Sequence, residues 1–135
     1  MKLDKNAHSV FLLRYHLILV VKYRRAVFDR KMSNRAKEIF KHIAPNYNIT
    51  LEEWDYDKDY IYALFKAHPS TEISKFINAY KSASSRLIKK EFSQIVPILW
   101  KKRFWSQSFL LLTTGKAPID VMEEYIENQT QKRNL

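Results

Sequence analysis

Stretches with the apolar pattern of a strand and stretches with that of a helix follow one another along this chain. Their order constrains the fold more than any other feature of the sequence. Residues 14–23, RYHLILVVKY, form a short, β-branched, apolar run that is typical of a strand covered on both faces. Residues 29–44 then place apolar side chains at helical spacing. Two further strands are expected over residues 49–55 and 59–67. The first half of the chain therefore predicts the order β-α-β-β.

The second half of the chain adds a helix, a strand and a last helix. A long helix is expected over residues 71–92, where apolar positions recur every three or four residues. A fourth strand is expected over residues 106–114, and a final helix over about residues 118–131. The complete order, β-α-β-β-α-β with an additional C-terminal helix, predicts an α+β fold of the ferredoxin-like arrangement. In that arrangement a four-stranded antiparallel sheet carries two helices on one face.

The length and composition of the chain bound its domain organisation and its environment. With 135 residues, of which 46% are hydrophobic, the chain is long enough for one domain with a core and too short for two. We expect a polar tail over residues 1–9 and a single domain over residues 10–135. The chain has no cysteine, which fits a reducing cytoplasm, and no apolar run near the ~20 residues of a membrane span. These features predict a soluble, cytoplasmic protein without a membrane partner.

The charge of the chain points to a polyanionic partner. Lysine and arginine total 24 against 14 acidic residues, which gives a net charge of +10. Nine of the acids fall in two short segments, residues 52–59 and 120–127, so the rest of the chain is more basic than its total suggests. A basic surface can simply aid solubility. It can also bind a nucleic acid, because cations that neutralise phosphates release bound counterions, and we favour this interpretation.

Two segments combine the residue types that bind single-stranded nucleic acid. Residues 100–105, WKKRFW, interleave aromatic rings that can stack on unpaired bases with cations that can hold the backbone. Residues 80–86 of the long helix mix hydroxyls with cations, which are common phosphate contacts. The tryptophans could instead fill the edge of a core, and the helix face could merely be solvated. The candidate DNA contacts are Arg24, Arg25, Lys81, Ser85, Arg86, Lys89, Trp100, Lys101, Lys102, Arg103 and Trp105.

Two pairs of residues are spaced so that the side chains of each pair lie on the same face of one predicted element. Tyr60 and Tyr62 are two apart in a predicted strand, so both phenols emerge on one face, roughly 7 Å apart. Tyr125 and Gln129 are four apart in the last predicted helix and share a face. A tyrosine on such a helix commonly packs its ring and leaves its hydroxyl at the surface. It can also serve as a covalent nucleophile, although a pKa near 10 then requires activation.

Five segments together resemble a known family. KYRRAVF, KDYIYALF, FINAYKSASSRLIKKEF, FWSQSFLLLTTG and YIENQ occur in the same order in the TnpA-type single-tyrosine HUH transposases of the IS200 insertion-sequence group, and the resemblance covers about residues 8–130. It implies a homodimer on a ferredoxin-like fold that recognises DNA hairpins and cuts and rejoins single-stranded DNA. It also implies that Tyr125 is the nucleophile, forming a 5′-phosphotyrosine. A magnesium or manganese ion would be held by two histidines and by the glutamine that matches Gln129.

The sequence departs from this family where the family binds its metal. The two histidines of the HUH motif fall on Tyr60 and Tyr62, and a neutral phenol is a poor ligand for a hard cation. Asp55, Asp57 and Asp59 flank the pair and could substitute as ligands, although none is placed like the missing histidines along the strand. A second departure is Gly115-Lys116, where the family usually has two glycines.

Two functions of different classes follow. In the first, the chain is a DNA hairpin-binding protein of transposase descent whose strand cleavage is lost or weak, with no metal cofactor. In the alternative, it is an active transposase that cuts and rejoins single-stranded DNA with an unusual metal site. Retention of Tyr125 and Gln129 favours the alternative, whereas loss of both histidines favours the first function. Whether the chain is an enzyme stays open at this level.

Overall fold

The centre of the molecule is a four-stranded antiparallel sheet. The structure is a computed structural model that describes residues 3–5, 10–113 and 115–130. The strands lie in the order β4-β5-β3-β6, which is the ferredoxin-like order. Their bounds are Leu13–Val20 for β3, Thr50–Asp57 for β4, Tyr60–Ala67 for β5 and Leu110–Leu112 for β6. The fold predicted from the sequence is confirmed.

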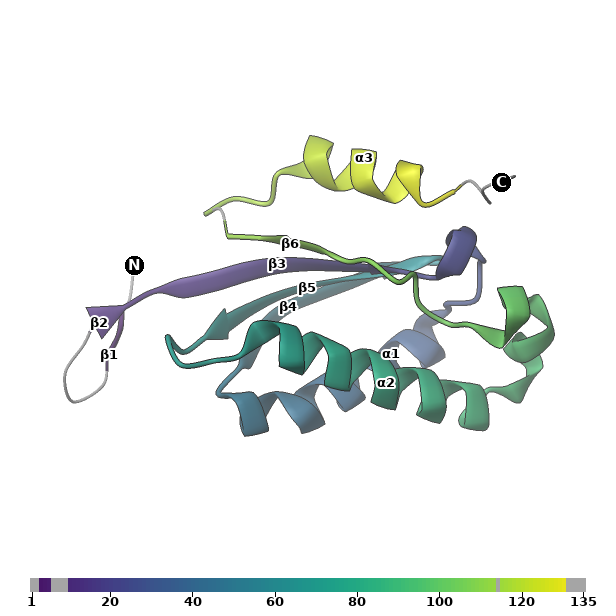
Figure 1. Ribbon diagram of the computed structural model, residues 1–135, viewed down its shortest axis with the longest axis horizontal. Helices are drawn as coiled ribbons and strands as arrows, with labels where there is room; N and C mark the ends of the chain where they lie inside the picture. The colour runs from purple at the N-terminus through teal and green to yellow at the C-terminus, as the bar shows by residue number, and fades with distance from the viewer. Residues whose placement is uncertain (1–2, 6–9, 114, 131–135) are drawn as a thin grey trace.

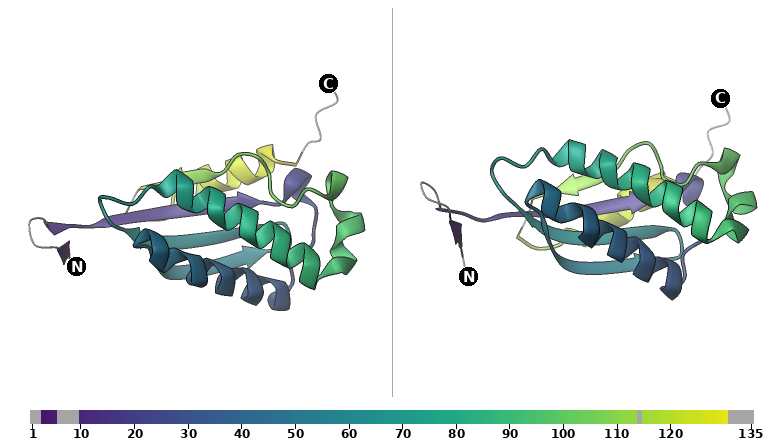
Figure 2. Two further views of the ribbon diagram at one scale, coloured as in Figure 1. Left: turned by 60° about the horizontal axis from the view of Figure 1, so that its bottom comes forward. Right: turned by 90° about the horizontal axis from the view of Figure 1, so that it is seen from below.

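Two helices cover one face of this sheet, side by side (Figure 2). Helix α1 spans Arg30–Ile43 and helix α2 spans Ile73–Glu91. The carboxylate of Asp29 accepts a hydrogen bond from the backbone N–H of Met32, 2.9 Å away, and so caps the start of α1. Between the helices and the sheet lies an apolar core whose largest fully buried side chains include Phe40, Phe65, Phe76 and Tyr80.

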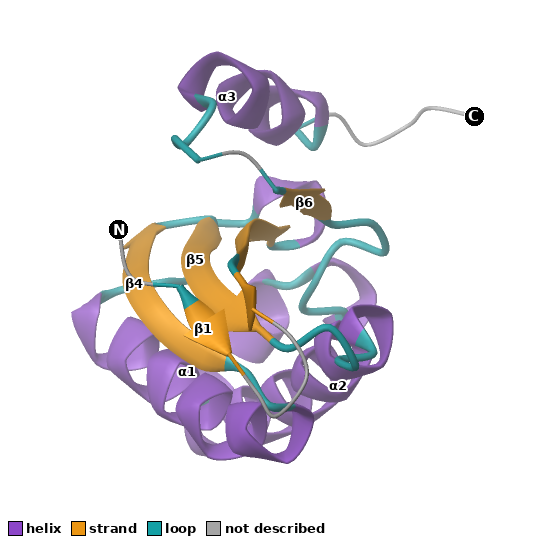
Figure 3. Ribbon diagram, turned by 90° about the vertical axis from the view of Figure 1, so that its left-hand side faces the viewer, coloured by secondary structure: helices purple, strands orange, loops and turns teal. Residues whose placement is uncertain are grey.

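The C-terminal helix α3, Ile119–Asn128, lies on the opposite face of the sheet (Figures 1 and 3). The molecule therefore has three layers, with α1 and α2 below the sheet and α3 above it. A small second cluster, built on Ile18, Val20 and Ile126, fills the space between α3 and the sheet. This open face, which α3 covers only in part, holds both tyrosines of β5.

Short 3-10 segments connect the main elements. They are η1 (Lys22–Arg24), η2 (Ala44–Tyr47), η3 (Ser93–Ile98) and η4 (Trp100–Lys102). The first strand was expected to reach residue 23, but β3 ends at Val20. Tyr23 and Arg24 adopt φ angles of 54° and 55°, which a strand cannot accommodate. The chain turns there instead.

The fourth strand is also shorter than expected. It was predicted over residues 106–114, yet only Leu110–Leu112 pair with β3. The Nζ of Lys81 donates to the backbone carbonyls of Ser106 and Gln107, at 2.8 and 2.9 Å. These two carbonyls therefore bond to a side chain, and of this stretch the N–H of Ser106 still donates to the carbonyl of Val20 at 2.8 Å. The expected ends of this strand at residue 114 and of the last helix at residue 131 lie outside the described residues.

The N-terminal segment contains a small ladder. Within the expected polar tail of residues 1–9, Asp4–Lys5 form β1, which pairs with β2 (Val10–Phe11) just after that stretch. Residues 1–2 and 6–9 lie outside the described part. Across the described ranges, no helix is both long enough and apolar enough to span a membrane.

Candidate functional site

Tyr60 and Tyr62 lie on the open face of the sheet, as the alternation of side chains along a strand predicts. Their neighbours Ile61 and Ala63 are fully buried against α1 and α2, whereas both tyrosines are half-buried. The two rings pack in the same cluster as Ile126 of α3. The expectation that both phenols share one face is confirmed.

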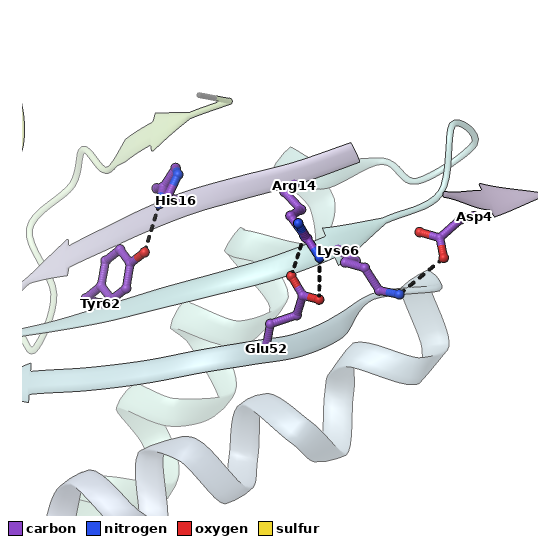
Figure 4. A network of polar contacts seen from close by, with 6 residues as sticks. All are labelled: Asp4, Arg14, His16, Glu52, Tyr62 and Lys66. Atoms are coloured by element: carbon purple, nitrogen blue, oxygen red, sulfur yellow. Dashed lines mark hydrogen bonds and ion pairs between the residues drawn. The ribbon is translucent and has the colours of Figure 1, made fainter. Parts of the chain in front are cut away.

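His16 is the partner of Tyr62, and sequence reasoning did not identify it. Nδ1 of His16 and the hydroxyl of Tyr62 share a hydrogen bond of 2.8 Å, and the two side chains point toward one another (Figure 4). His16 is on β3 and is only 3% exposed. The contact depends on the register of β3 against β5, in which Ile18 faces Tyr62. The sequence signal was a single histidine in an apolar strand, which by itself does not indicate a site.

Tyr125 of α3 packs into the cluster that contains Tyr60 and Tyr62. Its hydroxyl shares a 2.8 Å hydrogen bond with Oγ of Ser108, and burial raises the pKa of the phenol above its usual value despite this bond. Gln129 caps the C-terminal end of α3 and is half-buried. The fold therefore places the predicted nucleophile on the same face of the sheet as Tyr60 and Tyr62, packed against the same cluster.

The three aspartates near the pair have different surroundings. In the β4–β5 ladder, Asp55 faces Tyr62 and Asp57 faces Tyr60, so these carboxylates lie on the same sheet face as the phenols. The sequence alone did not show this placement, because strand pairing joins residues that are separated along the chain. Asp59 is buried and accepts a hydrogen bond of 2.8 Å from Nε of Arg24.

These residues do not fit a divalent metal ion. In the part of the chain that the structure describes, no group of three or more histidine, aspartate or glutamate side chains could hold one. Burial, followed by Asp57, Asp55 and Asp59, raises the pKa of Tyr60, and burial followed by Glu53 raises the pKa of Tyr62. Both phenols are therefore neutral at pH 7 and are weak ligands for magnesium or manganese.

A pocket of about 390 Å³ lies between the open face of the sheet and α3. We call it the acidic pocket, because its charged lining consists of Glu53, Asp55 and Glu123. None of the described residues that line it is a lysine or an arginine. The remaining lining residues are His16, Ile18, Tyr60, Tyr62, Leu64, Gly115, Ala117, Ile119, Met122 and Ile126. Its field repels phosphate groups.

A second hollow, of about 590 Å³, carries the opposite charge and lies along α2 and η4. We call it the basic groove. It brings together seven predicted DNA contacts from two separate segments, together with Ser82 and Phe104. The seven are Lys81, Ser85, Arg86, Lys89, Lys102, Arg103 and Trp105.

Two cations of the basic groove, Lys81 and Lys89, are held by backbone oxygens rather than by carboxylates. Lys89 donates from Nζ to the carbonyl of Lys102 at 3.1 Å, and Lys81 donates to the two carbonyls named above. Burial, and then the charge of Lys22, lowers the pKa of Lys81. No residue of the groove's described lining is acidic, so its charge is available to an anionic ligand.

Trp105 and the remaining predicted DNA contacts divide into three groups. Trp105 is 8% exposed and donates its indole N–H to Ser84 at 2.9 Å, so this ring belongs to the core, which corrects the expectation that it stacks on DNA. Arg24 is engaged with Asp59 and with Thr130. Lys101 is exposed and Trp100 is half-buried, both in η4, while Arg25 lies half-buried just after η1.

Comparisons with known proteins agree on one family. The family model described as "Transposase IS200 like" matches residues 9–129. The chain is 30% identical over 132 residues to the ISDra2 transposase TnpA of Deinococcus radiodurans, covering 98% of this chain and 94% of that protein. It is 24% identical over 129 residues to the transposase for insertion sequence element IS200 of Salmonella typhimurium, covering 96% and 84% of the two proteins.

Solved structures give the same result. A crystal structure from Deinococcus radiodurans, assigned to a transposase, superposes with a TM-score of 0.84 at 31% identity and covers 93% of this chain and 97% of that one. A REP-associated tyrosine transposase bound to a REP hairpin superposes with a TM-score of 0.59 at 6% identity, covering 92% and 68%. The second likeness concerns the fold alone.

Proposed function

The chain belongs to the IS200-like transposase family, and from this membership we propose that it binds DNA hairpins with single-stranded flanks through the basic groove, with strand cleavage lost or weak. The observation that carries the proposal is the separation of charge in the molecule. The groove along α2 gathers five cations and no described acid, whereas the pocket lined by Tyr60 and Tyr62 gathers three carboxylates and no described cation. DNA phosphates are attracted to the first and repelled by the second.

The REP-associated tyrosine transposase, which has a similar fold, is bound to a REP hairpin, and this supports a DNA hairpin as the ligand proposed here. Lysine and arginine contacts to phosphates position a nucleic acid without reading its sequence, and Ser82 and Ser85 add hydroxyl donors on the same helix face. We further propose that the protein acts as a homodimer, as the family resemblance implies.

Weak cleavage is supported by the chemistry of the residues around Tyr125. A phenol with a raised pKa is a poor nucleophile at pH 7 unless a base or an electrophile activates it. Tyr60 and Tyr62, which pack with Tyr125 against the cluster of Ile18, Val20 and Ile126, are neutral phenols, and the pocket that they line adds carboxylates, which do not neutralise a phosphate. The site thus keeps its nucleophile but has no described group that makes a DNA phosphate more electrophilic.

The alternative function, cleavage through a 5′-phosphotyrosine, is favoured by one observation. The Tyr125 ring lies in the same cluster as Tyr60 and Tyr62, and its hydroxyl is held by Ser108, so the nucleophile keeps a defined position. An active enzyme would form a covalent adduct with single-stranded DNA that requires the Tyr125 oxygen. A denaturing gel of the protein incubated with labelled hairpin DNA and manganese separates the two functions.

Binding is tested by fluorescence anisotropy with a labelled hairpin that carries single-stranded flanks, over a series of salt concentrations. We expect the logarithm of the affinity to fall linearly with the logarithm of salt concentration, by about 0.7–0.9 for each phosphate neutralised. The double variant Arg86→Gln, Lys89→Gln should bind more weakly and reduce this slope by about two.

The matched control changes two cations of α1. Lys37 and Lys41 line a small hollow together with Glu52 and Glu53, so their charges have acidic neighbours. The variant Lys37→Gln, Lys41→Gln should bind almost as the unaltered protein does. Equal losses in the two double variants, or an affinity that does not depend on salt, would show that the basic groove is not the DNA site.

A further inference from the structure

Two turns at one end of the molecule hold an unusual backbone conformation. Tyr23 and Arg24 in η1 have φ angles of 54° and 55°, and Lys101 and Lys102 in η4 have φ angles of 49° and 61°. This left-handed region normally favours glycine, because a Cβ atom is crowded there. Non-glycine residues persist in it where the surroundings determine them, and such residues gather at binding sites. The large side chains at these positions therefore call for an explanation beyond the path of the chain.

The two turns are in direct contact, although they are far apart in sequence. The rings of Tyr23 and Trp100 meet edge to face with their centroids 5.1 Å apart. The backbone N–H of Lys22 donates to the carbonyl of Phe104 at 2.8 Å, which ties η1 to the segment that follows η4. Both turns lie at the end of the molecule where α3 finishes (Figure 1).

Lysine side chains surround this aromatic pair. Nζ of Lys22 lies 5.1 Å from the Tyr23 ring centroid and 5.8 Å from that of Trp100, and Nζ of Lys101 lies 4.6 Å from that of Trp100. These are cation–π distances, so the ammonium groups lie beside an aromatic surface. Trp100 and Tyr23 are half-buried and Lys101 is exposed, so the cluster is accessible from solvent.

The cluster continues into the basic groove. Lys102 belongs both to η4 and to the lining of the groove, and its carbonyl accepts the hydrogen bond from Lys89. On the other side, Lys22 is close enough to Lys81 to contribute to lowering its pKa. A nucleic-acid strand that leaves the groove at Lys102 would therefore meet the aromatic pair next.

We propose that Tyr23 and Trp100, with Lys22 and Lys101, form a binding site for one unpaired nucleotide of the single-stranded flank of the hairpin. The base stacks on the aromatic surface where the lysines now lie, and the displaced ammonium groups meet the neighbouring phosphates. Bases inside a duplex already stack on one another, so an unpaired base is the one that offers a free π-face. This site deepens the proposed function and rests on it.

The test compares three DNA ligands with the unaltered protein. They are a hairpin with a natural single-stranded flank, the same hairpin with abasic nucleotides in the flank, and a blunt hairpin. Abasic sites keep the phosphates and remove only the bases. We expect the abasic flank to bind about five- to 150-fold more weakly than the natural flank, which is the range for loss of one stacked base. Equal affinity for the natural and abasic flanks would overturn the inference.

The variant Trp100→Leu identifies the protein side of the contact. It should bind the natural flank as weakly as the unaltered protein binds the abasic flank, should show no further loss with the abasic flank, and should leave the blunt hairpin unaffected. Losses of equal size with all three ligands would assign Trp100 a purely structural role and overturn the inference. The comparison of the ligands with unaltered protein needs no variant, so it stands even where Trp100→Leu does not fold.

Tryptophan fluorescence provides a readout that a purely electrostatic contact would not change. The chain has three tryptophans, and Trp54 and Trp105 donate their indole N–H groups to Ser33 and Ser84. Stacking of a base should quench the fluorescence on binding, and the quench should persist in the control variant Trp54→Phe and disappear in Trp100→Leu. A quench that persists in Trp100→Leu would overturn the inference.

Failure of the inference and failure of the proposed function give different results. If all three hairpins bind with equal affinity, the basic groove can still be the DNA site and only the nucleotide site is refuted. If none of the three hairpins binds, the nucleotide site and the proposed function are both refuted.

Discussion

At the scale of single residues, Tyr60 and Tyr62 determine the chemistry of the open face of the sheet. Burial raises the pKa of both phenols, and the carboxylates around them raise it further. Tyr62 is additionally engaged with His16 through a 2.8 Å hydrogen bond. The pair therefore contributes neutral hydroxyl groups to an acidic pocket, where two imidazoles would contribute ligands for a metal ion.

The double change Tyr60→His, Tyr62→His should restore a metal-dependent activity. Both imidazoles would emerge on the open face beside Tyr125, with Asp55 and Asp57 directly across the ladder. We expect binding of manganese or magnesium, measured by isothermal titration calorimetry, and a covalent protein–DNA adduct on a denaturing gel. The adduct should disappear when Tyr125→Phe is added, because that change removes only the attacking oxygen.

The same assay on the unaltered protein can contradict this prediction. A manganese-dependent adduct through Tyr125 in the unaltered chain would show that the phenols do not impair cleavage. If the restored variant binds metal but forms no adduct, another departure from the family, such as Gly115-Lys116, limits the position of the tyrosine helix.

At the scale of elements, Arg24 joins three parts of the structure. It lies in η1, its Nε donates to the carboxylate of Asp59 in the β4–β5 turn, and its Nη1 donates to Thr130 just after α3 at 2.7 Å. Asp59 is 4% exposed, so loss of the arginine would leave a buried carboxylate without this hydrogen bond. The end of the tyrosine helix is thus fastened to the turn that precedes β5.

Arg24→Gln should destabilise the protein more than Asp59→Asn does. Removal of the arginine leaves a buried carboxylate without its cationic partner, whereas the asparagine leaves no buried charge. We expect a loss of roughly 2–3 kcal/mol for Arg24→Gln in urea unfolding, below the full value for a buried pair because the arginine side chain is 31% exposed. An equal or larger loss in Asp59→Asn would contradict this account of the contact.

Tyr80 joins the two helices beneath the sheet, and it makes stability sensitive to alkaline pH. Its hydroxyl donates to the carbonyl of Ala36 in α1 at 2.9 Å, and complete burial raises the pKa of the phenol far above its ordinary value of 10.0. The folded state therefore binds this proton more tightly than the unfolded state does. The corresponding stability is complete below pH 10 and falls as the pH rises above 10.

Tyr80→Phe should reduce that alkaline loss. At pH 7 the variant loses one hydrogen bond, so its free energy of unfolding should be lower by about 1 kcal/mol. Between pH 10 and pH 11 the difference from the unaltered protein should shrink, because the variant has no phenol to ionise at this position. Urea unfolding at the two pH values measures the difference, and a constant difference would contradict the prediction.

At the scale of the whole molecule, opposite charges lie on opposite sides of one sheet. The acidic pocket is between the sheet and α3, and the basic groove runs along α2 on the other side. One edge of the sheet is the three-residue strand β6, which pairs only with β3 among the described strands. Ile119 and Val121 of α3 are 59% and 45% exposed. Unpaired strand edges and exposed apolar side chains are features that association covers.

The protein should therefore be a homodimer in solution. Light scattering at micromolar concentration should give twice the 16.2 kDa mass of one chain. The double change Ile119→Ser, Val121→Ser on α3 should weaken association if this helix lies at the interface, while the same change should leave the fold intact because both side chains are exposed. A stable mass of 16.2 kDa for the unaltered chain would contradict the dimer.

Local patterns in the sequence determined the elements and which side chains share a face. The period of two along residues 60–67 places Tyr60 and Tyr62 together, and the helical spacing after Asp29 yields α1. These features depend on residues a few positions apart, because the geometry of the backbone within one helix or strand fixes the direction in which each side chain points. The excess of cations and its distribution likewise predicted a basic surface, which the groove along α2 provides.

Contacts between distant parts of the chain were decided only by the tertiary structure. The registers of β3 and β4 against β5 bring His16 and Asp55 to Tyr62, and no local period encodes a register between strands. The meeting of Tyr23 with Trp100, and the burial of Trp105, depend in the same way on how the ends of the strands and η4 pack. Side-chain spacing sets direction along one element, whereas packing of the whole chain selects which elements meet.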